Sequence, residues 1–226
     1  MRKSFAGVMA YILVSASVPV FAEGFLDLYA GSSFTDTATV KISSNVAITS
    51  GDVSFKSDAT YGIRGGYWLK KLPWLGIAGD ISSLHASGKN MKFDIIPITP
   101  MAMFRLPLFI DEEIPQGRLQ PYFGVGPSIS LYTYAHADLG PPTGDISGTS
   151  SGGKAVGFQL PAGVAIQLSR RVALFSEYRY AFCKVDVEQN YITQIFGSIW
   201  NSNNVARNVK TDLSIHNVLL GISFRF

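Results

Sequence analysis

Residues 158–168, FQLPAGVAIQL, decide the fold of this chain. Every second residue from Phe158 to Leu168 is apolar, and glutamine, proline, glycine and alanine stand between them. Since successive side chains of a β-strand point to opposite faces, this period of two predicts a strand with one apolar face and one more polar face.

The same alternation recurs along the rest of the chain, in segments of about ten residues with Gly, Ser, Asn and Asp between them. The apolar positions of these segments carry no charged residue. The sequence therefore predicts eight strands, at 25–34, 58–69, 75–84, 93–106, 121–134, 155–168, 172–183 and 212–226.

The opposite face of the predicted strands holds three acids and three arginines, so that its charges sum to zero. A soluble barrel would turn its apolar face inward and carry many Lys and Glu outside. Here the polar face is poor in charge and rich in glycine, which suits a small closed interior whose side chains pair with one another, while the apolar face meets lipid. The prediction is an all-β fold, an eight-stranded antiparallel transmembrane up-and-down β-barrel, with a lumen ion-pair network of Asp27, Arg64, Asp80, Arg105, Glu177 and Arg179.

The connections between the strands support this topology. Segments 35–57, 135–154 and 184–211 are long and polar, whereas 70–74 and 169–171 are short. Long loops on one side and short turns on the other are typical of outer-membrane barrels, and an even strand count puts both chain ends on the short-turn side. Segment 107–120 is long for such a turn, and the pattern does not explain it.

Aromatic and proline residues add two expectations. Aromatic rings near both ends of the strands predict two belts at the membrane interfaces. Since proline cannot donate to a β-ladder, the prolines within the strands predict bulges or missing ladder bonds. The expected short-turn belt is Tyr67, Trp68, Trp74, Phe104, Phe123, Phe224 and Phe226; the loop-side belt is Tyr61, Tyr132, Tyr134, Tyr180 and Phe182; the prolines are Pro97, Pro100, Pro127 and Pro161.

The N-terminus has the pattern of an export signal. Arg2 and Lys3 precede an apolar stretch that is short for a membrane span and contains Pro19. Val20-x-Ala22 fits the small-residue cleavage rule, so residues 1–22 are predicted to be a cleaved signal peptide and residues 23–226 the barrel domain. Without Arg2 and Lys3 the formal charge falls from +3 to +1, which argues against an electrostatic nucleic-acid binder.

Several motifs resemble those of a known family. The chain ends in LGISFRF at 220–226, which resembles the C-terminal assembly signal of bacterial outer-membrane proteins at Gly221, Phe224 and Phe226. YGIRGGY at 61–67, PYFGVG at 121–126 and FSEYRY at 175–180 are similar to small OmpA-like barrels of the outer membrane protein β-barrel domain family. The resemblance implies a location in the outer membrane of a Gram-negative cell, contact with its lipids, and insertion by the barrel-assembly machinery.

Chemistry is sparse in the sequence. The lumen charges could form a gate or a structural plug. The single cysteine, Cys183, and the scattered histidines match no metal-site spacing, and no phosphate loop or cofactor motif is present. Ser214 and His216 share a lipid-facing strand face, as in lipid A-modifying acyl hydrolases, but the sequence places no acid beside them; His85 and His136 lie at loop-side strand ends.

The predicted function is a non-catalytic integral outer-membrane protein, structural or surface-exposed, with at most a narrow pore. Three alternatives stay open: a porin-like passive channel for small or hydrophobic solutes, a surface adhesin, and a lipid A-modifying enzyme. Apolar residues within 184–211, from Tyr191 to Trp200, could contact a host or partner protein, or they could belong to strands that extend beyond the bilayer.

Overall fold

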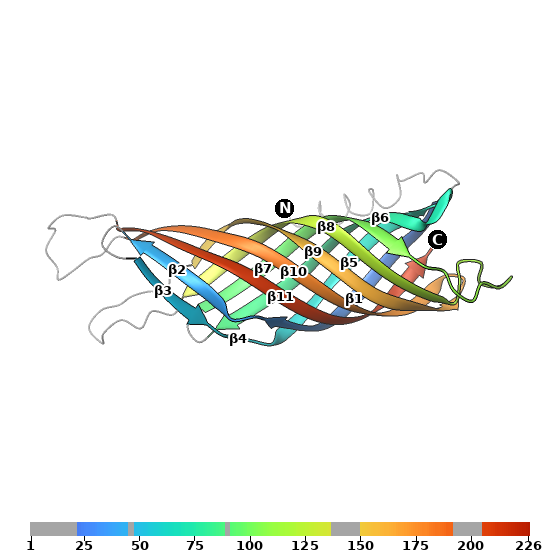
Figure 1. The fold of residues 1–226 in the computed structure, drawn as a ribbon, viewed down its shortest axis with the longest axis horizontal. Coiled ribbons are helices and arrows are strands. Elements are labelled where there is room, and N and C mark those ends of the chain that lie inside the picture. Colours follow the sequence, from blue (N-terminus) through green and yellow to red (C-terminus); the bar gives the residue numbers. More distant parts are fainter. Residues whose placement is uncertain (1–21, 45–47, 89–90, 137–149, 192–204) are drawn as a thin grey trace, which may run out of the picture.

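The chain forms one closed antiparallel barrel (Figure 1). A computed structural model describes residues 22–44, 48–88, 91–136, 150–191 and 205–226. Within these ranges no helix is long and apolar enough to cross a membrane. The predicted signal peptide lies almost wholly outside the described residues, which begin at Ala22.

Eight strands make the barrel wall, which confirms the predicted fold. Neighbouring strands pair in the order β1-β5-β6-β7-β8-β9-β10-β11, and β1 pairs with β11 to close the ring. The strands are β1 (Ala22–Thr35), β5 (Asp58–Leu69), β6 (Leu72–Gly88), β7 (Met91–Arg105), β8 (Leu119–His136), β9 (Ser150–Ser169), β10 (Val172–Tyr191) and β11 (Val205–Arg225).

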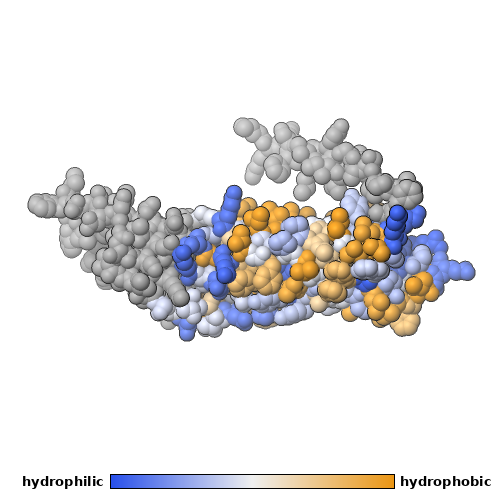
Figure 2. All heavy atoms as spheres, turned by 45° about the horizontal axis from the view of Figure 1, so that its top comes forward, coloured by the Kyte–Doolittle hydropathy of each residue, from blue (hydrophilic) through white to orange (hydrophobic). Residues whose placement is uncertain are grey.

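The predicted faces of the strands are those of the structure. Ile77, at an apolar position of β6, is 58% exposed, whereas Glu177, at a polar position of β10, is 1% exposed. Hydrophobic side chains gather over the middle of the outer wall, and hydrophilic ones lie toward its two ends (Figure 2). The apolar surface of the chain therefore faces outward, as a membrane-spanning barrel requires.

The long connections contain more strand than the sequence predicted. Segment 35–57 holds β2 (Ala38–Ser44), which pairs with the far end of β11, and β3 (Ile48–Val53), which pairs with β2. The two-residue strand β4 (Phe55–Lys56) pairs with β6. Residues 184–191 and 205–211 continue β10 and β11 as paired strands, so the assignment of the whole of 184–211 to a loop was wrong.

The ladders break next to prolines. Pairing between β7 and β8 stops at Ile98–Ile129 and resumes at Ala102–Val125, across Pro100. The β6–β7 ladder is interrupted opposite Pro97, and the β8–β9 ladder opposite Pro161. Missing ladder bonds are what the sequence predicted at these positions.

Among the belt residues whose side chains the structure describes, Trp68 and Tyr132 lie inside the barrel instead. Trp68 is 3% exposed and stacks on Phe25, because it has the opposite parity to Tyr67. Tyr132 is buried, and its hydroxyl donates to the Asp186 carbonyl. On the outer wall the short-turn belt contains a stack of Trp74, Phe104 and Phe123, with ring centroids 6.1 and 4.7 Å apart.

The unexplained segment between β7 and β8 is an ordered turn. Leu108 and Leu119 exchange backbone hydrogen bonds, and Arg118 donates to Asp111 at 2.6 Å. Gly117 has a φ of +87°, where a Cβ would lie 2.8 Å from the Leu108 carbonyl oxygen, so glycine is required. Arg170, beyond the end of β9, donates to the Glu112 and Glu113 carbonyl oxygens and ties the turn to its neighbour.

Candidate functional site

A chain of buried ion pairs crosses the barrel interior. Arg64 of β5 donates to Asp27 of β1 at 2.8 Å and to Glu177 of β10 at 2.6 Å. Arg179 of β10 donates to Glu177 at 2.8 Å and to Asp80 of β6 at 3.0 Å. All five side chains are at most 5% exposed.

Two tyrosines complete this network. The Tyr29 hydroxyl donates to Asp80 at 2.8 Å and accepts from Arg179, whose guanidinium lies 4.7 Å from the Tyr29 ring centroid. The Tyr122 hydroxyl donates to Glu177 at 2.8 Å. Glu177 thus accepts from Arg64, Arg179 and Tyr122, and the network links strands on opposite sides of the barrel.

Arg105, the sixth predicted lumen residue, lies in a separate group. Its guanidinium donates to Glu23 at 2.5 Å and to the Pro73 carbonyl at 2.8 Å, near the short-turn end of the barrel. Arg225 is buried beside the same glutamate, 3.8 Å away. Neither Glu23 nor Arg225 was among the predicted lumen residues; the inward parity of Arg225 in the last strand was the available signal.

Aromatic and thioether side chains pack around and between members of both charged groups. They include Phe25, Trp68, Met103, Tyr122 and Phe175. The void among them, next to Asp27 and Arg64, is about 10 Å³. A cavity of that volume holds at most one water molecule.

The loop-side half of the interior is apolar, which the sequence analysis did not expect. Phe93, Ile95, Leu213 and Ile215 are each at most 1% exposed and pack in one cluster with Cys183. These residues have the inward parity of their strands, and the outward residues beside them, such as Lys92, Asp94 and Asp212, are polar, so the polarity of the two faces is reversed near the loops. The interior is therefore polar in its middle and apolar toward the loops.

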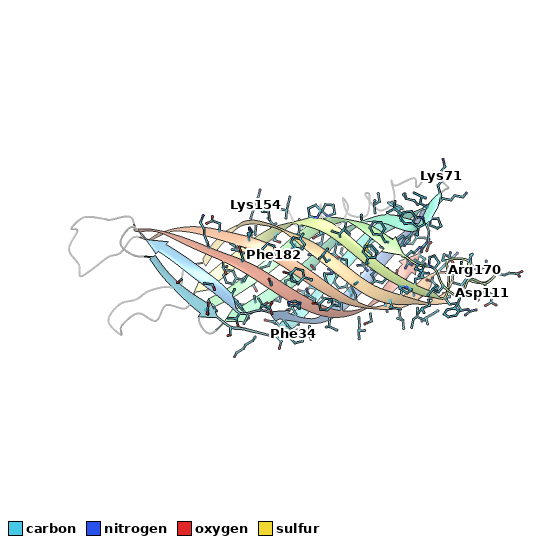
Figure 3. The ribbon with its side chains drawn as sticks, viewed as in Figure 1. Phe34, Lys71, Asp111, Lys154, Arg170 and Phe182 are labelled. Carbon is cyan, nitrogen blue, oxygen red and sulfur yellow. The ribbon has the colours of Figure 1, made fainter. Side chains whose placement is uncertain are left out.

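A wide cavity of about 1030 Å³ opens at the short-turn end. Arg105, Arg170, Arg171, Arg225 and Glu23 line it together with apolar residues of the 106–118 turn. Lys71, Asp111 and Arg170 all lie at this end of the molecule (Figure 3). The cavity is a basic vestibule at the short-turn mouth of the barrel, next to Arg105 and Arg225.

The predicted Ser214–His216 pair is not joined. Both side chains face outward on β11, but the Ser214 hydroxyl bonds to Tyr180 at 3.2 Å. The His216 ring bonds to Tyr178 through Nδ1 at 2.5 Å and to Asp36 through Nε2 at 3.1 Å. Both ring nitrogens therefore have partners other than Ser214.

A different serine and histidine are joined on the outer wall of β6. The Ser83 hydroxyl lies 3.3 Å from His85 Nε2, and Asp94 Oδ1 of β7 lies 2.7 Å from His85 Nδ1. Sequence reasoning singled out His85 but not Ser83 or Asp94. The signal was a Ser-x-His at outward positions, with an acid nine residues after the histidine across a short hairpin.

The remaining predicted sites are placed as follows. Phe224 and Phe226 point outward, and Phe226 exchanges backbone hydrogen bonds with Gly24 at 2.7 and 3.0 Å. Gly221 faces Tyr29, where a Cβ would lie 2.4 Å from the Phe175 ring. Within the described part of the chain no group of three His, Cys, Asp or Glu side chains could hold a metal ion.

Comparisons with known proteins agree on the architecture. The family described as outer membrane protein beta-barrel domain matches residues 8–226. The comparison with curated proteins gives no match.

Several solved structures share the fold. The outer membrane protein OprG from Pseudomonas aeruginosa is 14% identical with a TM-score of 0.56, and the match covers 91% of this chain and 97% of that one. The outer membrane protein AlkL is 19% identical with a TM-score of 0.50, covering 93% of both chains. The outer membrane protease OmpT from Escherichia coli is 10% identical with a TM-score of 0.45, covering 94% and 100%. At these identities the likeness to OprG and AlkL concerns the fold and not the activity.

Proposed function

Because the chain belongs to the outer membrane protein beta-barrel domain family, we propose that it is a structural, surface-exposed protein of the bacterial outer membrane whose barrel is closed to solutes. The buried network of Asp27, Arg64, Asp80, Glu177 and Arg179 is the observation that supports the proposal. In this proposal the role of the barrel interior is structural and not catalytic.

The network favours a plug because every charge in it has an opposite partner. Arg64 contacts two carboxylates, and so does Arg179. An eight-stranded barrel is only wide enough for its side chains to fill it, and here guanidinium groups span the width. Opening a path would separate ion pairs whose side chains are at most 5% exposed, which is costly in a medium of low dielectric.

Conductance in planar lipid bilayers tests this proposal. The protein purified from outer membranes should leave the current at baseline, and Glu177→Ala and Arg105→Ala should leave it there while lowering stability. Steady conductance steps for the unaltered protein would overturn the proposal. Steps that appear only in Glu177→Ala or Arg105→Ala would indicate a gate instead of a plug.

A channel for hydrophobic solutes is the second candidate, and the apolar loop-side interior favours it. Leu84, Phe93 and Ile95 line this half of the barrel with Leu213 and Ile215. Apolar linings suit apolar ligands, which gain free energy on leaving water. Uptake of a hydrophobic fluorescent dye into protein-containing vesicles, faster than into protein-free ones, would support this candidate over a closed barrel.

Export and assembly are part of the proposal. We propose that cleavage after Ala22 leaves Glu23 as the first residue, which keeps its ion pair with Arg105, and that Gly221, Phe224 and Phe226 are recognised by the barrel-assembly machinery. The mass of the isolated protein tests the cleavage site, and a start at another residue would contradict it.

Adhesion to a host or partner protein is a further proposal. It depends on the loops, and the apolar residues Ile192 to Trp200 lie outside the described residues. Deletion of 190–204 should abolish surface binding if these residues make the contact, and unchanged binding would reject them as the contact site.

A further inference from the structure

We propose that Ser83, His85 and Asp94 form a lateral hydrolase site on the outer wall of the barrel, which cleaves a carboxyl ester of a lipid in the surrounding leaflet. The inference is independent of whether the lumen is closed, since none of the three side chains faces the interior.

The connectivity is that of a serine–histidine–acid triad. Ser83 and His85 are two residues apart on the outer face of β6, and Asp94 stands opposite His85 in the β6–β7 ladder. An ionised Asp94 can only accept, so the hydrogen of the 2.7 Å bond is on His85 Nδ1. In the neutral imidazole His85 Nε2 is then the acceptor for the Ser83 hydroxyl, 3.3 Å away.

Strands on both sides of β6 position these side chains: β5 holds Ser83, beside which the β6–β7 ladder is interrupted, and β7 holds His85. The Thr60 hydroxyl donates to the Ser83 carbonyl oxygen at 2.9 Å, and Ser83 lies opposite Tyr61 of β5. His85 and Asp94 are a registered pair on neighbouring strands. Sites built on paired strands hold their geometry better than sites on loops.

The position of the site on the wall identifies the substrate class. On the membrane side of Ser83 the outward residues are Ile81 and Ile98, and opposite Ser83 stands Ile96; each is more than 40% exposed. On the loop side the outward residues Ser87 and Lys92 are polar or charged. The triad therefore lies where the apolar band ends, which is the depth at which lipids carry the ester bonds between acyl chains and headgroups.

Lys92 adds a positive charge to the site. Its ammonium lies 3.3 Å from Asp94 Oδ1, and its side chain is 55% exposed. A cation there attracts the anionic headgroups of the leaflet. Tyr61, 58% exposed on the neighbouring strand, offers an aromatic surface for an acyl chain.

The proposed reaction has two steps with water as the second substrate. The Ser83 oxygen forms a bond to the ester carbonyl carbon while its proton moves to His85 Nε2, and the carbon–oxygen bond breaks as that proton passes to the leaving alcohol. Water then attacks the acyl-serine, His85 takes its proton and returns it to Ser83, and the fatty acid leaves. Asp94 stays ionised and stabilises the imidazolium.

The second serine–histidine neighbourhood of the barrel supplies a matched control. Ser214 and His216 also lie two residues apart and face outward, but their hydrogen bonds go to Tyr180, Tyr178 and Asp36. Ser214→Ala and His216→Asn are therefore matched controls for Ser83→Ala and His85→Asn, because they make the same substitutions on the outer wall outside the proposed triad.

The test measures fatty-acid release by mass spectrometry. The full protein isolated from outer membranes is incubated with vesicles of phosphatidylethanolamine and, separately, with purified lipopolysaccharide, which distinguishes the two sources of ester. We expect release from at least one of them, reduced roughly 10³-fold or more in Ser83→Ala and His85→Asn. Ser214→Ala and His216→Asn should keep the rate of the unaltered protein.

A second measurement uses only the unaltered protein, so it does not require that any variant folds. A fluorophosphonate probe reacts with activated serines, so the unaltered protein should carry the probe on the peptide that contains Ser83. No release from either lipid together with no adduct on Ser83 would overturn the proposal. Release that persists in a folded Ser83→Ala variant would overturn it as well, whatever the conductance measurement gives.

Discussion

Glu177 accepts hydrogen bonds from three side chains in the middle of the barrel. Arg64 and Arg179 are each buried, and Glu177 is the carboxylate that they share. A buried cation that loses its partner keeps the cost of its desolvation without the compensating attraction. The stability of the barrel therefore depends more on Glu177 than on any charge at its surface.

Replacement of Glu177 tests this dependence. Glu177→Ala should lower the free energy of unfolding by about 3–5 kcal/mol, because it leaves Arg64 and Arg179 short of a partner. Glu177→Gln keeps one carbonyl oxygen that can accept two hydrogen bonds, so it should lower the free energy of unfolding by less than Glu177→Ala does. Urea-induced unfolding in vesicles, followed by tryptophan fluorescence, measures both. The control is Glu113→Ala, an exposed pair with Arg118, which should change stability by less than about 1 kcal/mol. An equal effect of the two alanine variants would contradict the argument.

The turn carboxylate Asp111 gives a pH-dependent prediction. Hydrogen bonds from Arg118 and from the Ile114 N–H hold the pKa of Asp111 below its ordinary value. Since the folded pKa is lowered, the stabilisation is present above the unfolded pKa and is lost as the pH falls through the folded pKa. An NMR titration should show a lowered pKa that returns toward about 3.9 in Arg118→Ala. An unchanged titration in that variant would show that Arg118 is not the cause.

At the residue level, the sequence predicts which face a side chain occupies but not which partner it meets. Parity alone placed Arg64, Asp80 and Glu177 inside the barrel. Arg105 has the same parity, but it joins Glu23 because partners depend on how far each strand is displaced along its neighbour. The contact of His85 with Asp94 depends on the register between β6 and β7, so the sequence alone did not predict it.

The turn between β7 and β8 shows how a long connection is kept rigid. Residues 106–118 are fixed by the Leu108–Leu119 backbone pair, by Arg118 on Asp111, and by Arg170 from the neighbouring turn. Its left-handed residues are Phe109, with a φ of 55°, and Gly117. No periodicity of the sequence predicts such a turn, since side chain to backbone contacts build it.

Removal of Arg170 tests the turn as a unit. Arg170→Ala removes the donors to the Glu112 and Glu113 carbonyls, so the backbone there should open more often and be cut faster by a glutamate-specific protease. Arg171→Ala changes an adjacent arginine at the same mouth and is the control. Equal cleavage rates in the two variants would indicate that Arg170 does not hold the turn.

The eight strands were predictable because each of them shows the same alternation of apolar and polar residues. Alternation assigned the apolar positions of all eight strands to the outer wall, and the structure agrees at each of them. The extensions of β10 and β11 did not follow that rule, because outside the bilayer the polarity of the two faces reverses: Val185 faces inward and is 2% exposed. The outer face of these extensions is charged, as the Lys210–Asp186 pair at 2.9 Å illustrates.

Closure of the ring gives the whole molecule its resistance to opening. β1 pairs with β11 from Phe25–Arg225 to Thr35–Ile215, so that the sheet has no free edge in the membrane. The protein should therefore stay folded in SDS without heating and migrate differently from a boiled sample on a gel. Identical migration of heated and unheated samples would contradict a closed barrel.

The length of the last three strands has a consequence for what can approach the membrane beside them. β10 has 20 residues, of which about 10 are needed to cross a bilayer, so its outer part rises roughly 25 Å above the lipid. A soluble macromolecule that approaches on this side meets the ends of these strands before it reaches the leaflet. β6, which carries Ser83, stands opposite β10 in the ring and has 17 residues, so large soluble molecules come closer to the leaflet on the Ser83 side than on the β10 side.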